Sequence, residues 1–299
     1  MATRTKQPFS ISRILIHAFF CMLSLAFILP LWSIVSVSLS GEQDLVDYGY
    51  RLIPKHLDFG AYSYILSNPM TIVDAYKVTG IIAFTGTLLS LAVISMCAYP
   101  LSRADFKYRR IITFYLFFTM LFSGGLVPFY IMMTKYFHLQ NNYAALILPS
   151  VGNVWYMFLM RTFFQQLPES LVESATIDGA GELRIYWRII LPLSTPVLAT
   201  VGLFQLLAYW NSWFHALLFI DKQNMYPLQY LLQVMMQNIQ EILQNMQNNV
   251  PVDANQLANL PTESTRMAMC ILTIGPMLFV FPFFQKYFAR GLTVGAVKG

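Results

Sequence analysis

The chain has 299 residues, of which 57% are hydrophobic and 11% are charged, and its formal net charge is +5. Soluble domains carry about 25% charged residues, so this composition excludes an ordinary soluble protein. It predicts a polytopic membrane protein that is surrounded by a lipid bilayer, and we expect no nucleic-acid partner.

The residues that usually carry chemistry form no recognisable pattern. Three cysteines, Cys21, Cys97 and Cys270, all fall in apolar runs, which indicates small buried side chains and not a disulfide framework or a zinc site. The four histidines are scattered, and the sequence contains no G-x-x-x-x-G-K-[ST] phosphate-binding loop. We therefore expect no catalytic residue, no metal site and no cofactor in this chain.

Six apolar stretches are long enough to cross a membrane as helices, which takes about 20 residues each. They predict an all-α fold with a six-span domain at 14–287. The first stretch is longer than the roughly 7–15 apolar residues of a cleaved signal peptide, so we predict that it is retained as a span. The predicted spans are Ile14–Leu39, Thr79–Leu101, Ile111–Met133, Tyr143–Phe164, Leu193–Ile220 and Met267–Tyr287.

Lysine and arginine predict the orientation of these spans, because both are enriched in cytoplasmic loops. With the N-terminus inside, most of the 19 basic residues fall in inner segments. We therefore expect a membrane protein whose termini are both cytoplasmic. The N-terminal segment would be 1–13, the tail 288–299, and the loop 168–192 would also be cytoplasmic.

The loop at 221–266 is the longest of those predicted outside. Apolar residues recur at helical spacing between Leu228 and Leu243. This spacing favours a helix that lies over the outer mouth of the protein. The alternative is a disordered polar loop.

The inner loop contains a polar stretch, Glu169–Pro192, between two strongly apolar regions; we call it the 169–192 segment. Pro168 suits the first turn of a helix, and the glutamates that follow place negative charge near the positive end of the helix dipole. Gly179 lies in a turn and suits the left-handed conformation that closes a helix. The segment is therefore predicted to fold as a helix, a tight turn and a second helix at the membrane surface.

The spacing of this segment resembles the EAA loop of permease subunits of ABC importers. Glu173-Ser174-Ala175 is followed by Gly179 and, after nine intervening residues, by Ile189-x-Leu191-Pro192. Ser174 departs from the pattern, which has alanine at that position. The C-terminal stretch Arg290–Gly299 resembles the tail of maltose-permease-like sugar importers.

Three further stretches resemble a narrower branch of these permeases. That branch imports oligosaccharides from polysaccharide breakdown, as in the polygalacturonan, rhamnogalacturonan and alginate systems. The stretches are Phe122–Pro128, Arg161–Phe164 and Tyr209–Phe214.

The resemblance implies a type I ABC importer permease fold and a transport subunit, not an enzyme, in a bacterial plasma membrane. It implies a second homologous permease, two separate ATPase subunits that bind ATP and Mg, and an extracytoplasmic sugar-binding protein. The 169–192 segment would be the coupling helix region, with Glu173, Ser174, Ala175, Asp178, Gly179 and Ala180 as coupling residues. The tail residues that match the family pattern are Gly295, Lys298 and Gly299.

Polar and aromatic residues inside the predicted spans are candidates for the path of the sugar. Polar groups are costly in lipid, and aromatic faces with a few hydrogen-bonding groups suit a sugar. The alternative interpretation is helix packing with an interfacial aromatic belt. The candidates are Asn153, Trp155, Trp210, Asn211, Ser212, Trp213 and His215, whereas we interpret Ser123–Gly125 as a kink or close-packing site.

Two other functions stay open at the level of sequence. One is a permease of the same fold for a non-sugar solute, which the coupling loop alone does not exclude. The other is a polytopic membrane enzyme, which would need a catalytic constellation that we do not find. The residues also leave open which oligosaccharide is carried.

Overall fold

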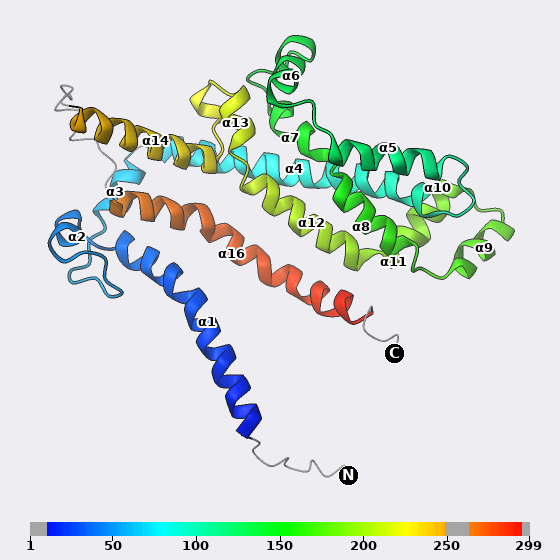
Figure 1. Cartoon of the computed structure of the whole chain (residues 1–299), viewed down its shortest axis with the longest axis horizontal. Coiled ribbons are helices and arrows are strands. Elements are labelled where there is room, and N and C mark those ends of the chain that lie inside the picture. The colour runs from blue at the N-terminus through cyan, green and yellow to red at the C-terminus, as the bar shows by residue number, and fades with distance from the viewer. Residues whose placement is uncertain (1–10, 68, 249–262, 295–299) are drawn as a thin grey trace. The chain divides into compact units, whose positions relative to one another are not determined.

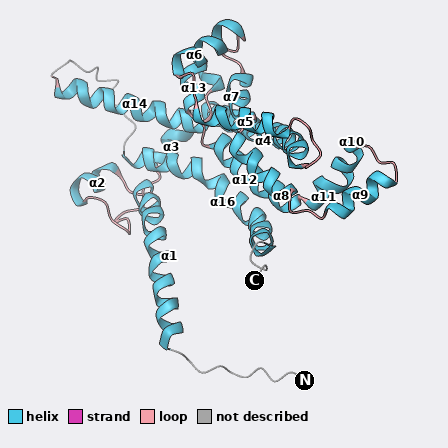
Figure 2. Cartoon of the chain, turned by 45° about the vertical axis from the view of Figure 1, so that its right-hand side comes forward, coloured by secondary structure: helices cyan, strands magenta, loops and turns pink. Residues whose placement is uncertain are grey.

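The computed structural model describes residues 11–67, 69–248 and 263–294 (Figure 1 and Figure 2). Regular structure in these residues is helical, apart from one isolated antiparallel bridge between Ser40 and Leu57. The chain divides into two compact units. One contains the described residues 11–67, 235–248 and 263–273, and the other contains 69–234 and 274–294. Gly295, Lys298 and Gly299 lie outside the described residues.

The first unit begins with α1 (Ile11–Ser38), whose apolar side chains are mostly exposed. An apolar helix with exposed side chains is expected where lipid is the solvent. Two short helices follow, α2 (Glu42–Tyr48) and α3 (Gly60–Leu66). The Ser36 hydroxyl donates to the Arg51 carbonyl at 2.6 Å, and this bond fixes the connecting loop to the end of α1.

Two helices have residues in both units, α14 (Leu228–Gln247) and α16 (Glu263–Val294). The helix predicted between Leu228 and Leu243 is confirmed by α14, while its place over an outer mouth stays a prediction. The backbone N–H of Leu228 donates to the Thr79 hydroxyl at 2.9 Å. The sixth predicted span lies within α16, which continues into the predicted tail.

The second unit is built around α4 (Pro69–Ser102), which begins earlier than the predicted span at Thr79. It contacts α7 (Tyr143–Val151), α8 (Val154–Phe164) and α12 (Thr195–Trp210). Figure 1 and Figure 2 both show α4 beside α8 and α12. The apolar core of this unit lies where these helices meet.

Buried polar side chains join α12 to its neighbours. The Tyr209 hydroxyl donates to the Ile147 carbonyl at 2.9 Å and lies 3.1 Å from the Ser90 hydroxyl. The Gln205 amide donates to the Ser150 carbonyl at 3.1 Å. In a bilayer, polar groups have to find partners inside the protein, so these bonds satisfy the side chains and hold α12 against α4 and α7.

In the part of the chain that the structure describes, three helices are each long and apolar enough to cross a membrane: residues 12–38, 69–102 and 263–284. Three bent pairs pass the same test when each pair is taken together, so length and composition allow three to six spans. The bends are 110° between residues 109–121 and 126–136, 46° between α7 and α8, and 79° between residues 182–193 and α12.

The third predicted span is not one continuous helix. After α5 (Arg109–Leu121) the chain turns by 110° before α6 (Leu126–Ile131) and the π-helix η1 (Met132–Tyr136). Gly125 has φ of 88°, which is a left-handed conformation that glycine adopts at little cost. The interpretation of Ser123–Gly125 as a kink is confirmed.

The fifth predicted span, Leu193–Ile220, is also wrong as a single helix. Its helix α12 ends at Trp210, and α13 (Phe214–Phe219) follows after a short break. The Asn211 side-chain amide donates to the Leu207 carbonyl at 2.9 Å. Asparagine side chains compete with the backbone ladder in this way, so the helix ends where Asn211 stands.

Candidate functional site

The 169–192 segment forms the predicted helix, tight turn and second helical stretch. The first helix is α9 (Glu169–Ile177), and after the turn come α10 (Glu182–Ile185), the π-helix η2 (Tyr186–Ile190) and α11 (Leu191–Leu193). In Figure 1 and Figure 2, α9 projects at one end of the second unit, beyond α8 and α12.

The turn after α9 depends on Gly179. Its φ is 76°, and no atom lies within 4 Å of the position that a Cβ would take. The N–H of Ala180 donates to the Ala175 carbonyl at 2.9 Å, and that of Gly179 donates to the Thr176 carbonyl at 3.0 Å. These two bonds define a Schellman motif, so the left-handed backbone, and not crowding, requires glycine here.

One face of the segment is buried in the core of the second unit. Val172, Ile185 and Ile190 belong to the same buried cluster as residues of α4, α8 and α12. Ala175 and Ala180, two of the expected coupling residues, are partly buried against this cluster. The segment is therefore fixed to the helix bundle through apolar packing and does not hang free.

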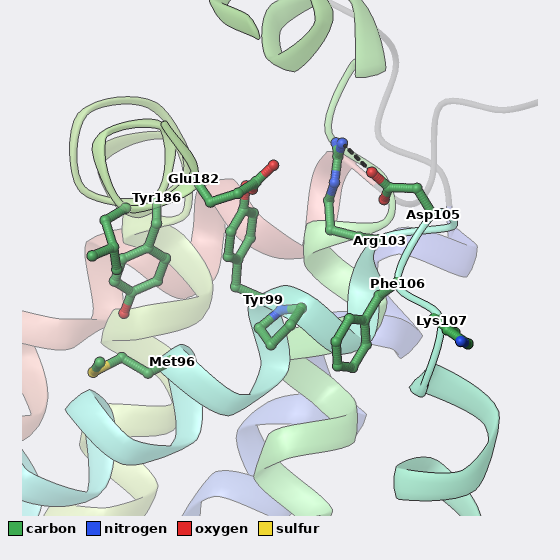
Figure 3. Close-up of a pocket in the computed structure, with 10 residues that line it drawn as sticks. Met96, Tyr99, Arg103, Asp105, Phe106, Lys107, Glu182 and Tyr186 are labelled. Carbon is green, nitrogen blue, oxygen red and sulfur yellow. Dashed lines mark hydrogen bonds and ion pairs between the residues drawn. The ribbon is translucent and has the colours of Figure 1, made fainter. Parts of the chain in front are cut away.

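Two tyrosines attach the segment to the end of α4. Figure 3 shows Tyr99 pointing towards Glu182, and its hydroxyl donates to the Glu182 carboxylate at 2.6 Å. The hydroxyls of Tyr186 and Ser95 lie 2.7 Å apart. Both tyrosines are buried, and their ring centroids are 5.5 Å apart. The sequence analysis missed this contact, because Tyr99 and Glu182 are separated by 83 positions and neither belongs to a local motif.

The opposite face of the segment is exposed and includes the carboxylates of Glu173 and Asp178. Glu173, Ser174 and Asp178 are exposed, and within the described ranges neither acid has an ion-pair partner. The Ser174 hydroxyl donates to the Ser170 carbonyl of its own helix at 2.8 Å. The two acids are thus available to a partner, whereas the hydroxyl is already used.

Ile177 stands at the tip of this exposed face. Its side chain is 86% exposed, although it is apolar and directly precedes the turn. The sequence analysis overlooked this residue. Its place in the sequence was a signal for exposure. Ile177 directly precedes the Asp178-Gly179 turn, at the end of the helix.

The first group of path candidates lies at the break between α7 and α8. The Asn153 side chain caps α8 by accepting from the N–H groups of Trp155 at 3.0 Å and Tyr156 at 3.3 Å. Trp155 is 63% exposed and lines a groove with Phe117 and Met120. Asn153 therefore serves the helix start, as expected of an N-cap asparagine.

The second group lies at the break between α12 and α13. Trp210 is buried, and Ser212 and Trp213 lie in the break. The side-chain Oδ1 of Asn211 accepts from the Gln229 side-chain amide at 3.0 Å. His215 lies on α13, and its Nδ1 is buried without a hydrogen-bond partner in the part of the chain that the structure describes. Both asparagines support local structure, and the role of these residues in a sugar path stays a prediction.

Comparison with known proteins shows which family and which sequences this chain is similar to. Residues 10–294 match the family model described as binding-protein-dependent transport system inner membrane component. Protein LplC of Bacillus subtilis (strain 168) is 38% identical over 275 residues, covering 91% of this chain and 90% of that protein. The polygalacturonan/rhamnogalacturonan transport system permease protein YtcP of the same organism is 35% identical over 288 residues, covering 95% and 97%.

A solved structure has a similar backbone. It comes from a bacterial ABC transporter involved in the import of the acidic polysaccharide alginate. The matched chain superposes with a TM-score of 0.79 at 27% sequence identity, and the match covers 94% of this chain and 100% of that one.

Proposed function

The chain belongs to the family of binding-protein-dependent transport system inner membrane components, and we propose that it is an oligosaccharide permease subunit driven through its 169–192 segment. The type I ABC importer permease fold expected from the sequence is confirmed. The family consists of transport components and not of enzymes, so the alternative of a membrane enzyme is set aside.

The proposed substrate is an oligosaccharide released from a larger polysaccharide. This is supported by relatives whose names refer to polygalacturonan, rhamnogalacturonan and arabinooligosaccharide transport, all aligned over most of the chain. The similar solved structure comes from a transporter involved in the import of alginate, an acidic polysaccharide. The competing proposal, a permease of this fold for a non-sugar solute, predicts no response to any oligosaccharide.

The proposed assembly contains a second homologous permease, two ATPase subunits and an extracytoplasmic sugar-binding protein. The ATPases bind ATP and Mg and lie on the cytoplasmic side, where both termini of this chain also lie. An exposed segment with unpaired carboxylates and an apolar tip suits insertion into a cleft of a partner protein. The coupling residues are Glu173, Ser174, Ala175, Asp178, Gly179 and Ala180, to which we add Ile177.

The single observation that carries the coupling role is that one face of α9 is exposed while the other is fixed to the membrane helices. Closure of the ATPase subunits displaces α9 and its turn. The movement passes through the Tyr99–Glu182 bond into α4, and through α11 across the 79° bend into α12. Packed helices respond to such a displacement by tilting as rigid bodies, which would change access to the path of the sugar.

The experiment that tests this proposal changes the exposed tip. Ile177→Glu should abolish co-purification of the ATPase subunits and transport, because it puts a charge into an apolar part of the docking cleft. Burying an unpaired charge costs several kcal/mol. Ile177→Leu should retain both the co-purification of the ATPase subunits and transport.

Val46→Glu is the matched control, because Val46 is also an apolar residue with an exposed side chain, at 78%, and it lies on α2 in the other unit. It should leave the ATPase subunits attached. If Ile177→Glu keeps the ATPase and transports at the wild-type rate, the segment is not the coupling site.

A further inference from the structure

A groove between α5 and α8 collects positive charge and contains no acidic residue. Its volume is about 660 Å³, and its walls come from α5, α8 and the linker before α5. None of its basic residues takes part in an ion pair within the described ranges of the chain. The basic residues that line it are Lys107, Arg109, Arg110 and Arg161.

Arg161 is the most enclosed of these four cations. The hydrogen bond that its Nη1 donates to the Thr113 hydroxyl is long, at 3.5 Å. Its Nε is buried with no hydrogen-bond partner in the described part of the chain. A partly buried guanidinium without a counter-charge is unfavourable. The groove is therefore electrostatically incomplete without an anion.

The part of the groove that is farther from the linker is aromatic. Phe114 lies one helical turn after Arg110 on α5, and Phe158 lies one turn before Arg161 on α8. Residues three or four apart share a helix face, so both walls change from cationic to aromatic in the same direction. This direction leads away from the linker, towards phenylalanines on α5 that are exposed, Phe114 at 69% and Phe117 at 49%. A ligand with an anionic head and a hydrocarbon tail matches this order.

The groove lies at the same end of the second unit as the 169–192 segment. Phe106 and Lys107 of the linker line this groove and also a neighbouring cavity of about 450 Å³ whose other residues include Glu182 and Tyr186. In Figure 3 the ring of Phe106 points into that cavity, whereas Lys107 points away from it. The cationic end of the groove therefore lies on the side of the membrane that we assign to the cytoplasm.

We propose that the α5–α8 groove binds an anionic phospholipid, with its phosphate at the arginines and its acyl chains along the phenylalanines. Guanidinium groups hold phosphates through paired, charge-assisted hydrogen bonds. Basic pockets between membrane helices on the cytoplasmic side suit such headgroups. The inference rests on the membrane location and the proposed orientation, and does not need the coupling role of the 169–192 segment.

The test measures phospholipid retention by the purified importer complex. The complex is exchanged into nanodiscs that contain phosphatidylglycerol and phosphatidylcholine, released, and analysed by native mass spectrometry. The wild type should retain phosphatidylglycerol in preference to phosphatidylcholine. Arg161→Gln and the double variant Lys107→Gln/Arg110→Gln should each lower this preference, by about fivefold for each charge removed.

Lys135→Gln serves as the control, because Lys135 is exposed on η1 outside the groove, and it should retain lipid as the wild type does. If Arg161→Gln does not accumulate, the double variant decides the question, since Lys107 and Arg110 are both exposed. Unchanged preference in the double variant overturns the proposal. Loss of the ATPase subunits with full lipid retention also overturns it, because an acidic protein surface would then be the occupant.

Discussion

Tyr209 shows at the residue scale how α12 is positioned. Its ring lies directly over Gly86 of α4, so that an added Cβ at Gly86 would stand 2.7 Å from ring carbons. Its hydroxyl reaches both the Ile147 carbonyl and the Ser90 side chain. The missing side chain at Gly86 thus allows the ring to enter and the hydroxyl to find its partners.

We predict that Gly86→Ala lowers the thermal unfolding temperature of the detergent-solubilised protein. Overpacking a closely packed site costs about 1–3 kcal/mol, and the ring of Tyr209 is held by its own hydrogen bonds. Gly80→Ala is the matched control on the same helix, because nothing lies within 4 Å of its added Cβ. Equal unfolding temperatures of the two variants would show that the Gly86–Tyr209 contact is not tight.

The structural roles of Gly179 and Gly86 differ in how far the sequence predicts them. Gly179 was identified from its neighbours in the chain, because Asp178-Gly179 follows a helical pattern and a turn there needs a left-handed residue. Gly86 lies in an apolar run without any local signal. Its role depends on contact with Tyr209, which is distant in the chain. That contact could not be predicted from a single sequence.

At the scale of elements, the joint between the 169–192 segment and α4 is the feature most relevant to transport. α9 presents an exposed face, α10 and η2 are held by apolar packing, and two tyrosine hydroxyls connect them to α4. A displacement of α9 is therefore passed to a helix that contacts α7, α8 and α12.

Removing one hydroxyl tests this joint. Tyr99→Phe should leave the ATPase subunits bound but reduce the stimulation of ATP hydrolysis by substrate, because Glu182 loses its donor. In a double-mutant cycle with Glu182→Ala, the stability coupling between the two residues should be roughly 1 kcal/mol. Tyr115→Phe, which changes an exposed tyrosine on α5, should have no effect. Additive effects of Tyr99→Phe and Glu182→Ala would mean that the bond does not connect the two elements.

The elements also show where sequence patterns reach their limit. Apolar length located all six helical regions, since a run of apolar residues is a local property. It did not reveal that the chain bends by 110° between α5 and α6, or that α12 ends at Trp210. Gly125 and Asn211 cause these breaks through backbone conformation and side-chain bonding, which hydropathy does not measure.

At the scale of the whole molecule, the proposed orientation places the 169–192 segment and the cationic end of the α5–α8 groove on the cytoplasmic side of the membrane. We predict that Gln165→Cys, in a variant whose native cysteines are replaced by alanine, reacts with a membrane-impermeant maleimide only after cell lysis. Asn224→Cys, in the loop predicted outside, should react in intact cells whose cell wall or outer membrane admits the reagent. Both side chains are exposed. The reverse labelling pattern would contradict the orientation derived from lysine and arginine.

The most direct test of the central claim is the ATPase activity of the complete importer in nanodiscs. The chain is expressed with the genes next to its own, purified, and assayed with the sugar-binding protein and a panel of neutral and acidic oligosaccharides. The account predicts that a second permease and an ATPase co-purify, and that ATP turnover rises only when the binding protein and one class of oligosaccharide are both present. A chain that purifies alone under mild detergent, or a complex whose turnover ignores every oligosaccharide, would contradict it.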